Sequence, residues 1–266
     1  MGTRIFGVVL VISTALLLMG LSMDNKEDIE RILKSTPPTG PFWMYGTVIM
    51  NRLSTDAEMK PVVFNHWSHR AKYTCRVCHL NLEFSMKAGD TEISTDSFHS
   101  EKYCGACHNG KASFTLKCGP KFECPKCHME EPKVLEQTFA KFAAPLPKTG
   151  FGDGIDWGKA LRDGKISPKN SLGGENTIVP LPEKLRQPFY FGTASHRSDV
   201  KFSHEQHSAD LDCSGCHPDL FNIKNKGTQK FTTEANHSGS FCSACHMKVA
   251  FPMKDCRRCH STMASK

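Results

Sequence analysis

The chain has 266 residues, of which 39% are hydrophobic, and it contains 20 Gly and 15 Pro. Such a composition supplies few aliphatic residues for an ordinary core and indicates a loop-rich fold. The formal charge of +7 suggests an acidic partner or nucleic acid, but the basic residues are spread along the sequence, which argues against nucleic-acid binding. The 13 Cys and 13 His require disulfides, zinc or a covalently attached group.

An apolar segment, residues 5–23, follows the basic start of the chain. Its length lies between that of a secretory signal and that of a spanning helix, which needs about 20 apolar residues. Gly20 and Ser22 are small and two apart, as at a signal-peptide cleavage site. We expect residues 1–23 to form a hydrophobic helix, either a removed signal peptide or a retained membrane anchor, and residues 24–44 to form a linker. In both cases the rest of the chain leaves the cytoplasm.

Two pairs of short β-branched or aromatic stretches predict small hairpins. The first pairs residues 47–53 with residues 61–64, and the second pairs residues 189–192 with residues 200–202.

The sequence Cys-x-x-Cys-His occurs six times and uses 12 of the 13 Cys. Two thiols at this spacing can form thioethers with the two vinyl groups on one edge of a haem, and the adjacent His can then bind the iron. Zinc sites and redox dithiols do not require that His. We therefore predict six covalently bound haem c groups. The predicted thioether residues are Cys75, Cys78, Cys104, Cys107, Cys124, Cys127, Cys213, Cys216, Cys242, Cys245, Cys256 and Cys259. The predicted proximal iron ligands are His79, His108, His128, His217, His246 and His260.

The order of motifs is duplicated along the chain. A Phe-x-His-x-x-His stretch begins at Phe64 and again at Phe202, and its first His lies nine residues before the next Cys in both places. We predict one three-haem unit at residues 45–130 and a second at residues 188–266. The faces of the haems would replace much of the missing aliphatic core, leaving mostly coil with short α-helices and the two small β-hairpins.

Residues 131–187, between the two units, are punctuated by Pro and Gly and read as a linker. Within it, residues 155–164 predict a short helix that stops at Gly164. We expect Trp157 and Leu161 to make this segment an ordered brace between the units rather than an idle spacer.

Seven histidines lie outside the motifs, and six of them are equivalent between the two units. The predicted distal iron ligands are His66, His69, His99, His204, His207 and His237. One distal imidazole for each haem leaves low-spin iron without an open site, which favours low-potential outer-sphere electron transfer over catalysis. His196 has no counterpart and is expected to be an ordinary exposed residue. Cys118 is expected to be a free thiol.

The stretches Phe64–His128 and Phe202–His260 resemble cytochrome c7, the three-haem relative of the cytochrome c3 family. The doubling, the N-terminal apolar segment and the long insert depart from that family. The resemblance implies the axial pairs His66–His79, His69–His108, His99–His128, His204–His217, His207–His246 and His237–His260.

The resemblance also implies a periplasmic relay in anaerobic or metal-type respiration, free or anchored to the cytoplasmic membrane through residues 5–23. The expected redox partners are a quinol-oxidising membrane complex and a terminal reductase or outer-membrane conduit. Three alternatives stay open: a membrane-anchored subunit of a quinol oxidoreductase complex, a multihaem reductase and a filament-forming cytochrome. The supply of distal histidines argues against a reductase.

Overall fold

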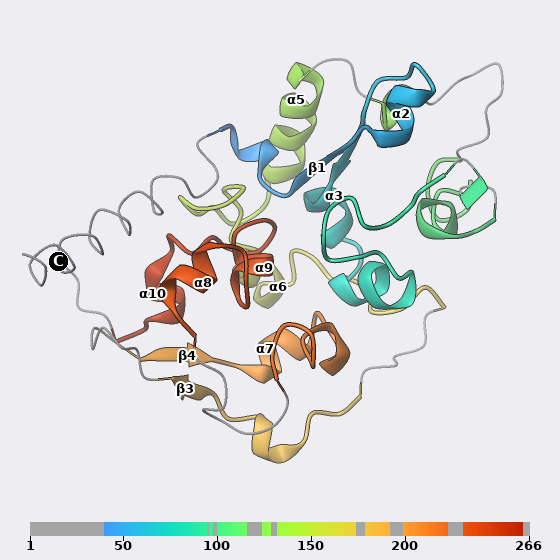
Figure 1. Ribbon diagram of the computed structural model, residues 1–266. Helices are drawn as coiled ribbons and strands as arrows, with labels where there is room; N and C mark the ends of the chain where they lie inside the picture. The colour runs from blue at the N-terminus through green and yellow to red at the C-terminus, as the bar shows by residue number, and fades with distance from the viewer. Residues whose placement is uncertain are drawn as a thin grey trace, which may run out of the picture.

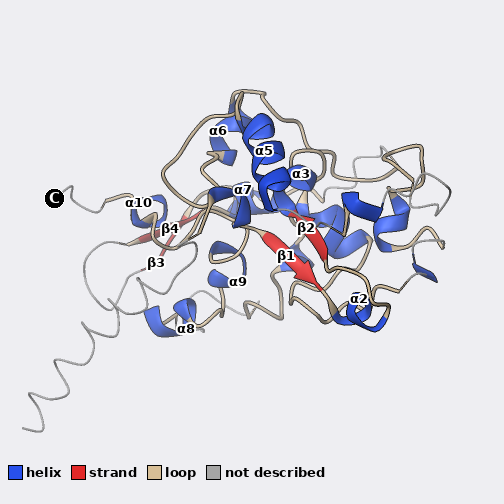
Figure 2. Ribbon diagram, turned by 90° about the horizontal axis from the view of Figure 1, so that it is seen from above, coloured by secondary structure: helices blue, strands red, loops and turns tan. Residues whose placement is uncertain are grey.

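The computed structural model describes residues 40–94, 96–97, 100–115, 124–128, 132–173, 179–191, 199–222 and 231–262. Its elements are short helices, single helical turns and two hairpins joined by long loops (Figures 1 and 2). This confirms the expected mixture of coil, short helices and small hairpins. The predicted N-terminal hydrophobic helix lies outside the described residues. Among the helices of the described ranges, none combines the length and apolar character needed to cross a bilayer.

The first half of the chain builds a hairpin that runs directly into a short helix. Its elements are η1 (Phe42–Met44), β1 (Thr47–Met50), α2 (Arg52–Asp56), β2 (Val62–Asn65), α3 (His66–Arg70), the π-helical turn η2 (Val77–Asn81), η3 (Tyr103–Ala106) and η4 (Cys124–Lys126). Strands β1 and β2 are antiparallel, with Val48 opposite Phe64. The predicted hairpin is confirmed, except that the chain leaves the first strand after Met50 and enters α2.

The second half repeats this arrangement. Its elements are η5 (Glu183–Leu185), β3 (Phe189–Phe191), β4 (Val200–Phe202), α7 (His204–Ser208), η6 (Cys213–Gly215), α8 (Thr233–His237), α9 (Ser243–His246) and α10 (Cys256–Cys259). Strands β3 and β4 are antiparallel, with Phe189 opposite Phe202, as the sequence predicts. Ser203 caps α7 by accepting a hydrogen bond from the Gln206 amide. In both halves a hairpin strand therefore leads into the helix that carries two of the predicted distal histidines.

The segment between the halves forms two helices, α5 (Pro132–Ala143) and α6 (Trp157–Arg162). The prediction of α6 is confirmed: Asp156 caps it by accepting from the Lys159 amide at 3.0 Å, and the chain turns at Gly164 with φ +64°. Helix α5 is an addition to the sequence-based expectation.

The buried apolar cluster of the described structure belongs mainly to this inserted segment. It consists of Trp67, Phe139, Ala143, Leu146, Ile155, Trp157 and Ala160. Trp67, from α3, meets Phe139 edge to face with ring centroids 5.3 Å apart. Figure 2 shows α5 and α6 beside α3 on one side of the molecule. Since α3 carries His66 and His69, the insert supports the element that presents two of the first unit's predicted distal histidines.

Replacing Phe139 by Ala tests whether this cluster stabilises the whole protein. Phe139 is 8% exposed, so the cavity left by its ring is expected to lower the free energy of unfolding by about 3 kcal/mol. Val134→Ala, on the same helix but at a side chain 51% exposed, should change it by less than about 0.5 kcal/mol. Urea unfolding of the holoprotein followed by circular dichroism measures both. Equal losses in the two variants would contradict the assignment.

Candidate haem-binding sites

The attachment motifs each form a single tight helical turn. In four of them the His amide donates to the carbonyl of the first Cys: His108 to Cys104 at 2.9 Å, His217 to Cys213 at 2.9 Å, His246 to Cys242 at 3.0 Å and His260 to Cys256 at 2.8 Å. Residues three apart in such a turn lie on the same face, so the two sulfurs of a motif point to one side. The first motif differs in form, because its second Cys and its His lie within the π-helical turn η2.

Several sulfur atoms of the motifs are shielded from solvent. Burial raises the pKa of Cys75 and of Cys78 to about 11. It raises the pKa of Cys104 to about 12. Such neutral, desolvated sulfurs suit contact with the apolar edge of a porphyrin.

Three of the predicted axial pairs face each other at a spacing that fits one metal ion between two imidazoles. A nitrogen ligand lies about 2 Å from its metal and the ring centroid about 1.1 Å farther, so two such rings have centroids about 6.2 Å apart. The observed centroid separations are 6.4 Å for His66–His79, 6.2 Å for His69–His108 and 6.2 Å for His207–His246. Their interplanar angles of 7°, 55° and 63° differ, as rotation about the metal–nitrogen bond allows.

Backbone carbonyls hold the Nδ1 atoms of five of these six imidazoles, the exception being His108, and of two further motif histidines. His66 contacts the Gly46 carbonyl at 2.7 Å, and His79 contacts that of Phe84 at 2.8 Å. The other contacts are His69 to Asn65 at 2.8 Å, His207 to Ser203 at 2.7 Å, His217 to Phe221 at 2.8 Å, His246 to Phe251 at 2.9 Å and His128 to Lys60. A carbonyl accepts only from a protonated Nδ1, so Nε2 is left as the atom that can bind metal.

Burial favours the neutral form of some of these imidazoles, the form that metal ligation requires. Burial lowers the pKa of His66 to about 4, and the nearby His79 adds to the lowering. Burial is also the main cause of the lowered pKa of His69, where His108 contributes in the same way. The pattern recurs for His204, whose pKa is lowered by burial and then by His217.

In each unit a phenylalanine ring packs against two of the predicted distal histidines, with closely similar geometry in the two units. The Phe64 ring lies edge-on to His66 at 4.9 Å, and Phe202 lies edge-on to His204 at 4.9 Å. The second His of each stretch also contacts the same ring, at 4.4 Å for His69 and 4.5 Å for His207. Each Phe-x-His-x-x-His stretch is therefore one packing unit that aims two imidazoles.

Some predicted site residues are not brought together by the described structure. His99, Cys118 and His196 lie outside the described residues, as does the side chain of Cys124. His237 is the last residue of α8, where burial lowers its pKa, and its expected partner His260 follows α10. The role of the carbonyls was missed by sequence reasoning, because a backbone acceptor such as that of Gly46 leaves no side-chain signal.

Together these residues fit haem c. The motif turns present paired sulfurs, and the imidazole pairs leave room for one iron each. The surrounding carbonyls orient Nε2 toward that position.

Gly46→Ala tests the carbonyl that holds His66. Gly46 has φ +74°, so an L side chain there should lower the free energy of unfolding by about 1 kcal/mol and move the acceptor of His66. Gly89→Ala is the control, since Gly89 also has a positive φ, +89°, but nothing lies near its added Cβ. Haem-resolved NMR should show a shifted signal for the haem bound by His79 in Gly46→Ala only. Unchanged haem signals in both variants would show that this carbonyl has no influence on the ligand.

Comparisons with known proteins agree with this geometry. The profile of the family described as "Cytochrome c7 and related cytochrome c" matches residues 62–129 and 200–261. No curated protein sequence matches the chain.

Similar solved structures are multihaem cytochromes. A c7-type three-haem cytochrome domain is 33% identical over 35% of this chain and 95% of its own, with a TM-score of 0.27. The C-terminal hexahaem fragment of GSU1996 is 23% identical over 85% of this chain and 98% of its own, with a TM-score of 0.26. The dodecahaem cytochrome c GSU1996 is 21% identical over 80% of this chain and 73% of its own, with a TM-score of 0.27.

Overall superpositions at such low TM-scores add no support, so the assignment rests on the two matched ranges and the motifs within them. Each range contains three attachment motifs. The chain therefore belongs to the cytochrome c7 family of multihaem c-type cytochromes and carries six covalently bound haem c groups.

Proposed function

We propose that this cytochrome is a low-potential electron-transfer relay in which every haem iron has two imidazole ligands. The observation that carries the proposal is the set of three imidazole pairs whose centroids lie 6.2–6.4 Å apart. A bound haem supplies an iron that takes up and releases single electrons. The protein's part is to fix both axial nitrogens, so that no position is open to a small ligand.

The proposed ligands follow the repeat. Each motif histidine is proximal, and the distal ligands are His66, His69, His99, His204, His207 and His237. For His99 and His237 the proposal rests on their equivalent positions in the two units. For the others it rests also on the contacts described above.

The surroundings of these ligands favour a low potential. A carbonyl that accepts from Nδ1 makes the imidazole a stronger donor at Nε2, which stabilises the oxidised iron. Imidazole in both axial positions also avoids the methionine ligand that raises the potential of other c-type cytochromes. With both positions filled, we propose a carrier and no catalytic reaction.

We further propose that the relay works outside the cytoplasmic membrane. The apolar residues 5–23 behind a basic start support export. A quinol-oxidising membrane complex would donate electrons, and a terminal reductase or an outer-membrane conduit would accept them. If residues 5–23 stay attached, the same relay would act as a tethered subunit beside the quinol-oxidising complex.

His207→Ala is expected to remove the distal ligand of one haem and leave one axial position of its iron free. The resting ferric protein should then show a high-spin signal from one haem in six, and the reduced protein should bind carbon monoxide at that haem. Gln206→Ala, at an exposed neighbour on α7, should leave all six haems low-spin. Electron paramagnetic resonance and carbon monoxide difference spectra measure this. Binding of carbon monoxide at several irons of the unmodified protein would refute the ligand scheme.

The proposed location predicts how the chain is processed. Cell fractionation followed by sequencing of the mature N-terminus should find the haem-containing protein outside the cytoplasm. A start after Ser22 in the soluble fraction identifies a free relay, whereas an intact start in the membrane fraction identifies a tethered one. Haem-containing protein recovered from the cytoplasm would contradict export.

A further inference from the structure

The two three-haem units touch along a seam, defined here by Tyr45, Arg70 and Arg76 on the first unit and residues 210–212 and 249–250 on the second. Arg70 Nη1 donates to the Val249 carbonyl at 2.7 Å. The Arg76 amide donates to the Asp210 carbonyl at 3.0 Å. The Arg76 guanidinium pairs with Asp212 at 3.4 Å. The side chains of this pair are 12% and 23% exposed, so the seam is a packed contact rather than a surface encounter.

On the second unit these contacts converge on one haem site. Asp210 lies in the turn after α7, which carries His207, and its amide donates to the His207 carbonyl at 3.2 Å. Val249 and Ala250 follow α9, which ends at His246, and the Tyr45 hydroxyl donates to the Ala250 carbonyl. His207 and His246 are the imidazole pair of the haem attached at Cys242 and Cys245. The turn that follows His207 and the segment that follows His246 are therefore both held against the first unit.

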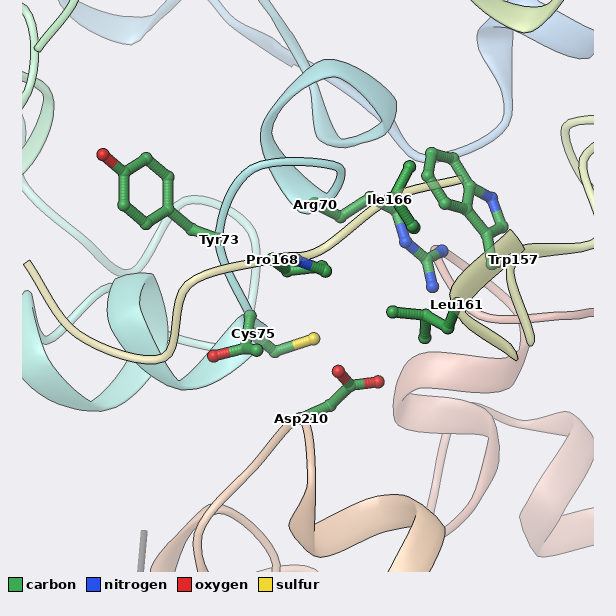
Figure 3. Close-up of a pocket in the computed structure, with 9 residues that line it drawn as sticks. Arg70, Tyr73, Cys75, Trp157, Leu161, Ile166, Pro168 and Asp210 are labelled. Atoms are coloured by element: carbon green, nitrogen blue, oxygen red, sulfur yellow. The ribbon is translucent and has the colours of Figure 1, made fainter. Parts of the chain in front are cut away.

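On the first unit the same contacts converge on the first attachment motif. Arg76 lies between its two cysteines, Cys75 and Cys78. Cys75, Arg70 and Asp210 line a small cavity between the units, and the Cys75 sulfur points toward the Asp210 carboxylate (Figure 3). Burial raises the pKa of the Cys75 thiol, and both Asp210 and Cys245 add to that rise. The first attachment motif therefore borders the second unit at Asp210.

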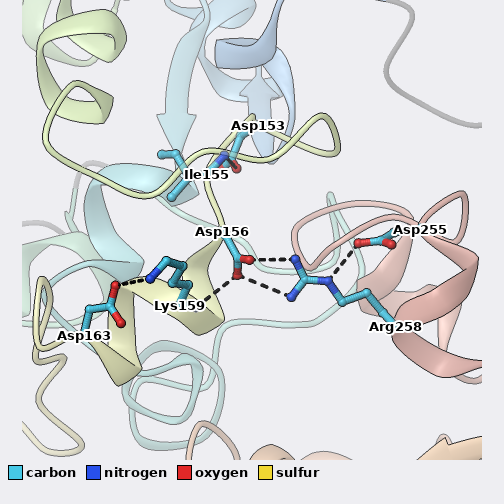
Figure 4. Close-up of polar contacts among 7 residues, drawn as sticks. All are labelled: Asp153, Ile155, Asp156, Lys159, Asp163, Asp255 and Arg258. Atoms are coloured by element: carbon cyan, nitrogen blue, oxygen red, sulfur yellow. Dashed lines mark hydrogen bonds and ion pairs between the residues drawn. The ribbon is translucent and has the colours of Figure 1, made fainter. Parts of the chain in front are cut away.

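The inserted segment spans the seam. Its Trp157 lies under the Arg70 guanidinium at 4.3 Å from the ring centroid. Its Asp156 accepts from Arg258 of α10 at 2.9 Å, and Asp255 holds the same guanidinium at 2.8 Å (Figure 4). The brace expected from the sequence is therefore matched by contacts on both sides of the seam, and these fix the relative position of the two units.

We propose that electrons cross between the units at this seam, from the haem attached at Cys75 and Cys78 to the haem held by His207 and His246, or in reverse. Arg70 is the positioning residue of this crossing. One electron passes at a time: the iron on one side is oxidised as the iron on the other is reduced, and no bond or proton is transferred. The inference rests on the proposed function. Chain order alone would instead join the third motif to the fourth, between which the insert lies.

Arg70 also sets the charge at the crossing. Arg70 lies four residues after His66 on α3, and therefore on the same face of that helix. Its guanidinium donates to the Val249 carbonyl, three residues after His246, so its positive charge lies near both haem sites. A fixed positive charge favours the reduced iron, which carries one positive charge fewer. Arg70 is therefore expected to raise the potentials of these two haems together.

The test is a haem-resolved redox titration by NMR of Arg70→Leu, Arg70→Lys and the control Arg52→Leu. In Arg70→Leu the midpoint potentials of the haems at Cys75 and Cys242 should both fall, while the other four stay unchanged. Arg70→Lys keeps the charge and should recover most of the shift. Arg52 pairs with Glu92 at the surface, its side chain 67% exposed, so the control should shift no haem.

The unmodified protein provides a second measurement should Arg70→Leu fail to fold. Reduction of the haem at Cys75 should change the midpoint potential of the haem at Cys242 more than that of any other haem of the second unit. The proposal would be overturned if the strongest redox interaction between the units joined the haems at Cys124 and Cys213. It would also be overturned if the midpoint potentials of the haems at Cys75 and Cys242 were unchanged in Arg70→Leu. If all six haems stay low-spin, either of these two results would reject the crossing at the seam but leave the proposed relay function intact. Loss of the low-spin state in the unmodified protein would reject the relay itself.

Discussion

The structure depends on one constraint, the distance at which two imidazoles must be held so that a single iron fits between them. In the three facing pairs, a motif turn brings one ring and helix α3 or α7 brings the other. A helix of five residues is too short to be stable on its own, so it must be fixed from outside. The preceding hairpin strand, the phenylalanine near the end of that strand, and the carbonyls that hold Nδ1 supply that support.

The duplication shows which of these supports are essential. Phe64 and Phe202 contact their histidines at nearly equal distances and angles, although the strands opposite them differ in sequence. The ligand-bearing stretch is therefore preserved as a unit, while its outer support varies. The inserted segment contacts Trp67 in the first unit, whereas the second unit relies on contacts among its phenylalanines, such as Phe231 with Phe241 at 5.2 Å.

Local signals in the sequence predicted the parts of the fold that local chemistry determines. The attachment motifs were recognised from the spacing of Cys and His, the hairpins from short β-branched or aromatic stretches, and α6 from the glycine that ends it. Each of these signals lies within a few consecutive residues. Helix α5 was missed because the prolines around it indicated a linker, although Leu135, Phe139 and Ala143 recur at the four-residue spacing of a buried helix face. The seam was not predictable, because most of its acceptors are backbone carbonyls, those of Asp210, Val249 and Ala250, which any residue could supply.

The buried apolar cluster has a consequence for how the protein matures. Six of its seven residues come from the inserted segment, and the seventh, Trp67, is on α3. This cluster needs no cofactor to bury its side chains, so it can order α3 before any haem is attached. The phenylalanines of the second unit are less protected, with Phe231 38% exposed. We therefore expect assembly to be asymmetric, with the first unit partly folded before haem attachment and the second unit folding as its haems are attached.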